Sequence, residues 1–291
     1  MIRVGMGTTS VLPRRLEPAF LLAREAGFDG IEVMITSDPA TQSARTIGAL
    51  SSRYGMPVLS IHSPVLLFST LVFGRDSRTK LERAAALAAE LGATTVVAHP
   101  PWRWQGRWAA EFELAVDRLV LDVSHASMAR VSTLELARAW GDRLHHVHLC
   151  DAAEPDAGGR LVDAHLVPGR GGQPVAELLR HLVASGFAGD VVAELNTRHC
   201  GRDDAARLAE LRETVGFARE HLARAAGTAG RQAGTTRGTL AGATPCPRGA
   251  RPSRPRRRPH RPTAPPTRCA RAARSSARCS AGGAESGRAA C

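Results

Sequence analysis

Residues 145–149 read His-His-Val-His-Leu, and this run has the two-residue alternation of a β-strand. Successive side chains of a strand point to opposite faces, so His146 and His148 share one face and the apolar residues share the other. The run follows a helical segment, 133–140, which ends at Gly141, a residue typical of helix C-termini. This order, a helix followed by a strand with imidazoles on one face, indicates one unit of an α/β fold.

The same alternation of β-rich runs and helical segments recurs along residues 1–227. It indicates a parallel sheet, and the lack of a GxGxxG turn favours a barrel over a dinucleotide-binding sheet. The predicted strands cover 3–7, 30–35, 58–63, 95–99, 120–124, 145–149 and 190–195. The predicted helices cover 16–26, 41–54, 78–91, 108–119, 133–140, 174–185 and 205–225.

Seven βα units are legible, one fewer than a complete barrel has. The predicted helix 108–119 passes directly into the predicted strand 120–124 without Gly, Pro or Asn, although such a connection normally takes about 2–6 residues. We therefore expect an α/β, TIM-like (βα) barrel over 1–227 that lacks one βα unit at about strand 5.

The positive charge of the chain is concentrated in its C-terminal part. The whole chain has a formal charge of +12, but residues 230–291 hold 14 arginines and one acid, which leaves 25 basic and 26 acidic residues in 1–229. The near-neutral body argues against a phosphate-backbone surface. Residues 228–291 are rich in Arg and Pro and poor in aliphatic residues, so we expect a disordered tail, either a nucleic-acid or membrane-surface arm or an extension without a specific role.

Cysteine usage and hydropathy bear on the compartment. Cys150 and Cys200 lie in the body and no CxxC pair occurs, which favours a reduced, cytoplasmic protein. Met1 leads almost directly into a predicted strand and no apolar run approaches the ~20 residues of a bilayer span, so we expect neither a signal peptide nor a membrane partner.

Five predicted strands place a His, Asp or Glu on the face opposite their main apolar set. Four of these, all but Asp122, lie within about a residue of the C-terminal end of the strand, where barrel enzymes keep their active sites. A single such residue is more often a satisfied core group, but a buried cluster of imidazoles and carboxylates needs a compensating cation. The residues are His62, His99, Asp122, the pair His146 and His148, and Glu194.

Two local motifs add ligand-type residues to this set. Asp122-Val-Ser-His125 spans a strand-to-loop turn, and Asp163-Ala-His165 precedes the Gly-rich run 168–172. Mixed nitrogen and oxygen donors suit Zn, Mn, Co or Fe(II) better than Ca or Mg.

Six motifs in this order resemble the xylose isomerase-like TIM-barrel superfamily, which contains sugar phosphate isomerases and epimerases and the endonuclease IV type of apurinic-site nuclease. They are SIHSP, VVAHPP, LDVSHAS, HVHLCDA, DAHLVPGRG and VVAELNT, and AREAGFDGIEVM, with Glu32, resembles the second strand of the family. The resemblance spans roughly residues 3–222.

The resemblance implies a divalent-metal site of Zn, Mn or Co. It implies as ligands His62, His99, Asp122, His125, His148, Asp163, His165 and Glu194. In the isomerase branch, the ligands that match are Asp122, His148 and Glu194, with His125 close to the substrate. The family has one more essential Glu, at the end of its fifth strand, and this sequence has no candidate for it.

Three functional hypotheses follow. The first is isomerisation or epimerisation of a sugar or sugar phosphate, with Glu194 and His125 as catalytic residues and Glu32, Trp102 and Arg170 as substrate-binding residues. The second is zinc-dependent cleavage of abasic DNA, which the fuller ligand set favours and the body charge disfavours. The third is a degenerate, inactive barrel that lacks one unit. We favour the first.

Overall fold

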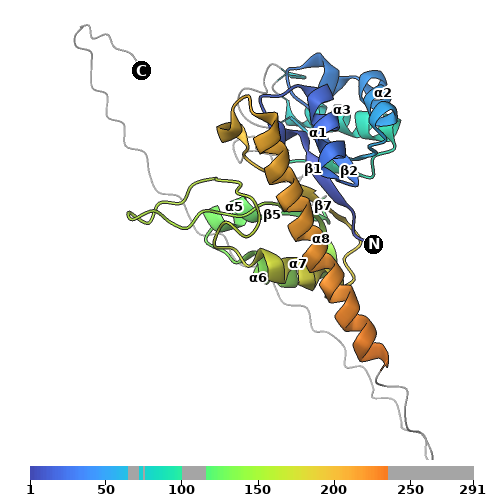
Figure 1. Ribbon diagram of the computed structural model, residues 1–291. Helices are drawn as coiled ribbons and strands as arrows, with labels where there is room; N and C mark the ends of the chain where they lie inside the picture. Colours follow the sequence, from blue (N-terminus) through green and yellow to red (C-terminus); the bar gives the residue numbers. More distant parts are fainter. Residues whose placement is uncertain (65–71, 75, 100–115, 235–291) are drawn as a thin grey trace, which may run out of the picture. The chain divides into compact units, whose positions relative to one another are not determined.

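Seven parallel strands form one sheet in the order β4-β3-β2-β1-β7-β6-β5 in a computed structural model, which describes residues 1–64, 72–74, 76–99 and 116–234 (Figure 1). The first strand lies in the middle of this order and pairs with both β2 and β7, so the sheet curls toward a barrel. The strands are β1 Val4–Gly7, β2 Gly30–Met34, β3 Val58–His62, β4 Thr95–Val97, β5 Leu119–Asp122, β6 Leu144–Leu149 and β7 Asp190–Ala193.

The barrel is nearly closed, with its opening between β4 and β5. Among the described residues no strand pairs with the outer edge of either, so β4 and β5 are the two edge strands of the sheet. This is the place where a strand 5 would stand in an eight-stranded barrel. The prediction of a TIM-like barrel without one βα unit is therefore confirmed.

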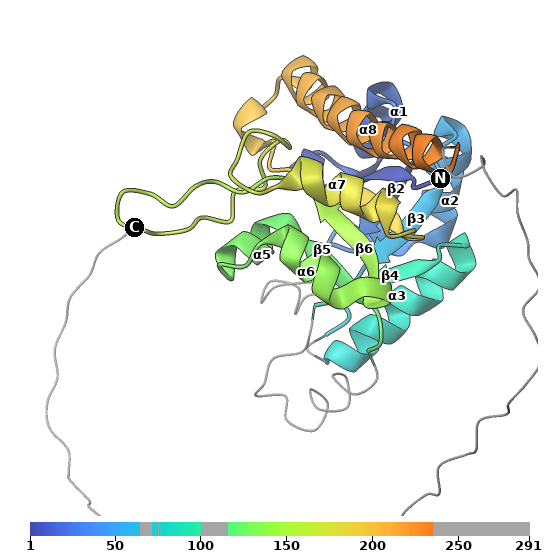
Figure 2. The ribbon, with the colours of Figure 1, turned by 90° about the horizontal axis from the view of Figure 1, so that it is seen from below.

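Helices cover the outside of the strands, as the view along the sheet shows (Figure 2). None of the described helices is long and apolar enough to cross a bilayer. The α-helices are α1 Leu16–Ala26, α2 Ala44–Tyr54, α3 Ser77–Leu91, α5 Val123–Met128, α6 Thr133–Trp140, α7 Val175–Ala184 and α8 Asp204–Gly234. The described 3₁₀ turns are η1 Thr8–Val11, η2 Pro39–Gln42, η5 Gly141–Arg143 and η6 Arg198–Cys200.

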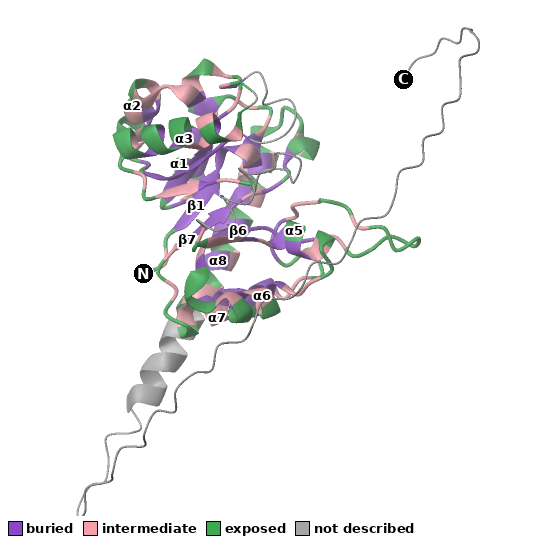
Figure 3. Cartoon of the chain, turned by 180° about the vertical axis from the view of Figure 1, so that it is seen from behind, coloured by how far each residue is buried: buried purple, intermediate pink, exposed green. Residues whose placement is uncertain are grey.

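Helix α1 illustrates how sequence pattern becomes packing. Its inner face, with Phe20 and Ala23, is fully buried, while the opposite face is exposed. The helix ends because Gly27 adopts φ 91°, and the N–H groups of Gly27 and Phe28 both reach the carbonyl of Ala23. Figure 3 shows the general result, with buried strands inside and exposed outer helix faces.

Three predicted boundaries differ from the structure. Strand β5 ends at Asp122 rather than residue 124, because the Asp122 carboxylate accepts a hydrogen bond from His125 N–H (2.9 Å) and caps α5. Asp122 therefore does lie at the end of its strand, contrary to the prediction. Of the predicted helix 108–119, residues 116–118 are not helical, Leu119 is in β5 and the rest lies outside the described residues. Helix α8 continues to Gly234, past the predicted domain boundary at 227.

Candidate metal centre

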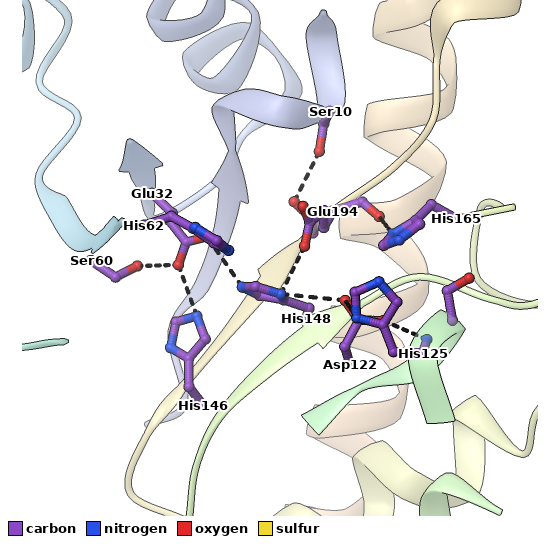
Figure 4. Close-up of polar contacts among 12 residues, drawn as sticks. Ser10, Glu32, Ser60, His62, Asp122, His125, His146, His148, His165 and Glu194 are labelled. Atoms are coloured by element: carbon purple, nitrogen blue, oxygen red, sulfur yellow. Dashed lines mark hydrogen bonds and ion pairs between the residues drawn. The ribbon is translucent and has the colours of Figure 1, made fainter. Parts of the chain in front are cut away.

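Carboxylates and imidazoles from five strands meet at the C-terminal end of the barrel (Figure 4). Strand β3 contributes its last residue, His62, and β5 contributes its last residue, Asp122. Glu194 follows β7 directly, and His148 precedes the last residue of β6. Parallel strands share one C-terminal edge, so residues distant in sequence converge there.

His148 lies at the middle of the cluster and contacts carboxylates through both ring nitrogens. Its Nδ1 lies 2.7 Å from Glu194 Oε2 and 3.5 Å from Asp122 Oδ2, while its Nε2 lies 3.1 Å from Glu32 Oε1. The His148 side chain is only 4% exposed, so these contacts take the place of water. The two nitrogens thus face opposite parts of the cluster.

Glu32 lies behind His148, away from the mouth of the barrel. Its Oε2 accepts a hydrogen bond from Ser60 Oγ (2.6 Å) and lies 3.0 Å from His146 Nε2. The His146 contact is close, but its geometry is not that of a hydrogen bond, and neither ring nitrogen of this buried histidine has such a partner. The Glu32 carboxylate is thus shared among three side chains, including His148.

The mouth side of the cluster is built around Asp163. Its carboxylate accepts a hydrogen bond from Ser124 Oγ (2.7 Å) and lies 3.1 Å from His165 Nε2 and 3.5 Å from His125 Nε2. The Nδ1–H of His165 donates to the Glu194 carbonyl (2.9 Å), which ties this loop to the end of β7. The side chains of His125 and Asp163 are 47% and 45% exposed, so this part can meet a ligand from solvent.

A chain of neighbouring imidazole rings connects the two sides. The centroid of the His62 ring lies 5.6 Å from that of His148 and 5.5 Å from that of His99. The His99 ring in turn lies 5.9 Å from the His125 ring. Because His99 follows edge strand β4 and His125 follows edge strand β5, this last contact crosses the opening of the barrel.

The electrostatics separate the imidazoles into two kinds. Burial alone would lower the pKa of His148, but the carboxylates of Glu194, Glu32 and Asp122 outweigh burial and hold that pKa well above its ordinary value. Burial would raise the pKa of Asp122, yet the His148 ring, 3.5 Å from Asp122 Oδ2, lowers it to about 2. Burial lowers the pKa of His62, and that of His99 to about 4, so both are neutral near pH 7, the form that binds metal.

The donor set fits a divalent metal ion. Asp122 Oδ2 is buried without a hydrogen-bond partner, a costly state for a carboxylate oxygen that an ion would relieve. Nitrogen and carboxylate donors together suit Zn, Mn or Co. Within this centre, three groups each have ligand atoms within 4.8 Å of one another: Glu32, His62 and His148; Asp122, His125 and His165; and Asp122, His148 and Glu194.

The structure brings together all eight residues predicted as ligands: His62, His99, Asp122, His125, His148, Asp163, His165 and Glu194. Arg170, predicted to bind substrate, does not join this cluster, because its guanidinium binds Glu210 (2.9 Å) and Glu213 (3.0 Å) of α8. Trp102 lies outside the described residues.

Sequence reasoning placed His146 on the same strand face as His148 but did not name it as a ligand, and it did not single out Ser60 or Ser10. Alternation is the signal for Ser60, which lies two residues before His62 as His146 lies two before His148. Ser10, in η1, donates to the Ala193 carbonyl (3.0 Å) and accepts from Leu195 N–H (2.9 Å), on either side of Glu194. No local pattern around Ser10 predicts this contact with β7.

Comparison with known proteins gives a consistent family. The profile of the xylose isomerase-like TIM barrels matches residues 20–120 and 109–221. An uncharacterised protein of Mycobacterium tuberculosis is 36% identical over 282 residues, which covers 77% of this chain and 99% of that protein. The fructoselysine 3-epimerase of Escherichia coli O157:H7 is 24% identical, covering 68% of this chain and 92% of that enzyme.

A solved structure shows the shared fold and the mycobacterial alignment shows a difference. The xylose isomerase domain protein of Alicyclobacillus acidocaldarius superposes with a TM-score of 0.56 at 19% identity, covering 78% of this chain and all of that one. In the mycobacterial alignment, 77% of 291 residues is about 224, against 282 aligned positions, so about 58 positions of the relative have no counterpart here. That length is enough for a βα unit of about 30 residues.

Proposed function

The chain belongs to the family of xylose isomerase-like TIM barrels, and from that premise we propose that it is a divalent-metal-dependent isomerase or epimerase of a ketose sugar. One observation carries the proposal. His148 Nδ1, Asp122 and Glu194 converge at the strand ends, and the buried Oδ2 of Asp122 has no hydrogen-bond partner. These three residues would hold the ion, and the fructoselysine 3-epimerase of E. coli supports a ketose as substrate.

The roles of the residues follow from their positions. The ion, when bound, would polarise adjacent oxygens of the substrate as a Lewis acid. The Glu194 carboxylate would take the proton from the carbon beside the carbonyl, and the bonds of Ser10 to residues 193 and 195 would keep that carboxylate in place. His125 has a half-exposed ring and would bind a substrate hydroxyl.

The number of bases bears on the reaction type. A single base can move a proton between neighbouring carbons on one face of the substrate, which converts a ketose to an aldose. Inversion at one carbon needs a second group to return the proton on the opposite face. No glutamate occupies the strand-5 position among the described residues, so Glu194 has no such partner within that part of the chain. We therefore favour isomerisation over epimerisation for this chain.

The test is metal analysis followed by turnover of an aldose–ketose panel. Purified full-length chain should contain about one Zn, Mn or Co per molecule, and it should exchange a substrate carbon-bound proton with deuterium from solvent. The variant Glu194→Gln should lose exchange, while the surface variant Glu135→Gln should keep it. A chain that takes up no metal would contradict the proposal and leave an inactive barrel.

Phosphodiester cleavage is the second candidate, because the Asp122, His125 and His165 group offers a further cation site beside the first. An abasic DNA duplex tests it with the same metal-loaded protein. Cleavage that is lost in His165→Ala, without turnover of any sugar, would replace the isomerase proposal by this one. The free thiols Cys150 and Cys200 accord with a cytoplasmic location, which we propose for either activity.

A further inference from the structure

A cavity of about 490 Å³ opens between the segments that follow β1 and β2. One wall is η1 with the turn into α1, residues 8–9 and 12–16, and the other is the connection 36–39 between β2 and η2 with the nearby Thr41. Met34, the last residue of β2, lies between the walls. None of the ligand-type residues described above lines this cavity, so it is a separate compartment.

The cavity adjoins the metal centre through backbone contacts. In the sheet, Gly7, the last residue of β1, pairs with Glu32, and Met34 pairs with His62. The cavity begins at Thr8, one residue beyond the end of β1. The hydroxyl of Thr8 accepts a hydrogen bond from Met34 N–H (3.0 Å) and joins the two walls. The same η1 turn carries Ser10, whose hydroxyl contacts the residues on either side of Glu194. A substrate held at the metal could therefore extend into this compartment.

The lining holds two guanidinium groups, Arg14 and Arg15, against one carboxylate, Asp38, so its formal charge is +1. The Arg14 guanidinium binds Asp204 (2.8 Å), which Arg207 also contacts, and the Arg202 carbonyl (2.9 Å). Asp38 has a structural role, because its Oδ1 accepts from Ala40 N–H (3.0 Å) and caps η2. Arg15 is exposed and has no ion pair or side-chain hydrogen bond within the described part of the chain.

The acid nearest to Arg15 in the sequence does not pair with it. Glu17, two residues further on, accepts hydrogen bonds from Arg53 (2.6 Å) and Tyr54 (3.0 Å) of α2. Two lining hydroxyls, those of Thr9 and Ser37, also have no partner among the residues that the structure describes. A free guanidinium beside free hydroxyls is a set of donors, and donors of this kind recognise an oxyanion.

We propose that this cavity binds an oxyanion, a phosphate or carboxylate, on the end of the substrate that lies away from the metal, with Arg15 as its cationic partner. The inference rests on the proposed function and names its substrate class as an anionic ketose. It also moves the anion site away from Arg170, whose charge Glu210 and Glu213 already neutralise.

Calorimetric titration of the metal-loaded full chain with fructose, fructose 6-phosphate and inorganic phosphate tests the proposal. Fructose 6-phosphate should bind about tenfold tighter than fructose, the effect of one charge-assisted hydrogen bond. Arg15→Gln should abolish this preference. Arg138→Gln, which removes an equally exposed charge from α6, should leave the preference unchanged.

Several outcomes would overturn the assignment. They are equal affinity of the two sugars for the wild-type chain, a preference that survives in Arg15→Gln, and Arg15-dependent binding of inorganic phosphate without binding of either sugar. The last would make the cavity a site for a free anion. Failure of the proposed function gives a different result from failure of this inference. In that case fructose 6-phosphate would still bind more tightly than fructose, in an Arg15-dependent way, but no sugar would exchange a proton with solvent.

Discussion

Replacing Glu32 with glutamine tests how the centre holds His148. The carboxylate lies 3.1 Å from His148 Nε2, so it fixes the proton on that nitrogen and leaves Nδ1 facing Asp122 and Glu194. If the amide oxygen of glutamine stays on Ser60, its NH₂ group faces Nε2 and donates to it. The proton would then move to Nδ1, where it blocks the ion.

Loss of such an outer partner typically weakens metal binding by about 10–100-fold. This range equals a loss of about 1.4–2.7 kcal/mol of metal-binding free energy. We expect Glu32→Gln near the upper end, because the amide NH₂ would donate to Nε2 where the carboxylate accepted from it. We would measure zinc affinity by competition with a chromophoric chelator, and the protonated ring nitrogen by ¹⁵N NMR of His148. The NMR signal separates loss of orientation from a general structural effect.

Two further variants keep the prediction refutable. Glu135→Gln, on exposed α6, should bind zinc like the wild-type chain. Ser60→Ala removes one hydrogen bond but keeps the carboxylate, so it should weaken binding less than Glu32→Gln does. Wild-type zinc affinity in Glu32→Gln, or an unchanged His148 tautomer, would refute the reasoning. If Glu32→Gln does not fold, an unchanged affinity in Ser60→Ala would count against it.

Three other expectations concern stability, measured by urea unfolding. Asp151 is fully buried, and its carboxylate accepts hydrogen bonds from four backbone N–H groups of the loop 152–173. Asp151→Asn should therefore lower the free energy of unfolding by about 3 kcal/mol, and a decrease below about 1 kcal/mol would contradict this. A methyl group on Gly30 would lie 2.6 Å from the Leu59 side chain, so Gly30→Ala should lower the free energy of unfolding by about 1–3 kcal/mol. An unchanged free energy of unfolding would contradict this. Removing metal present at about 100 times its Kd should lower the unfolding free energy by about 2.7 kcal/mol, and no change with EDTA would argue against a bound ion.

The alternation of strand residues predicted the strand-end part of the site, while the full ligand set, with the loop residues His125, Asp163 and His165, was implied by the family resemblance. It placed His62, Asp122 and Glu194 on one face of their strands, and the parallel topology brings those faces together. Strand ends were harder to predict, because Val123 and Ser124 continue a β-rich run. The hydrogen bond from His125 N–H to Asp122 starts a helix there instead.

Contacts between distant elements could not be predicted in the same way. Arg170 lies within a Gly-rich run that suits a phosphate, but its partners Glu210 and Glu213 lie some 40 residues further along, on α8. Glu32 was identified through the family resemblance as a substrate-binding residue, and only the fold shows that Ser60 and His148 share its buried carboxylate. Such contacts depend on packing angles that a single sequence does not encode locally.

Because of the opening between β4 and β5, metal binding also bears on how the chain unfolds. Edge strands expose unpaired amide groups, and ladder hydrogen bonds cannot join these two edges. The His99 and His125 rings nevertheless meet across the opening at 5.9 Å. An ion that took both His99 and His125 as ligands, beside the ion that Asp122, His148 and Glu194 would hold, would connect the two ends of the sheet. Amide protons of β4 and β5 would then exchange with solvent in concert, and the two halves of the chain would unfold as one cooperative unit only while the metal is bound.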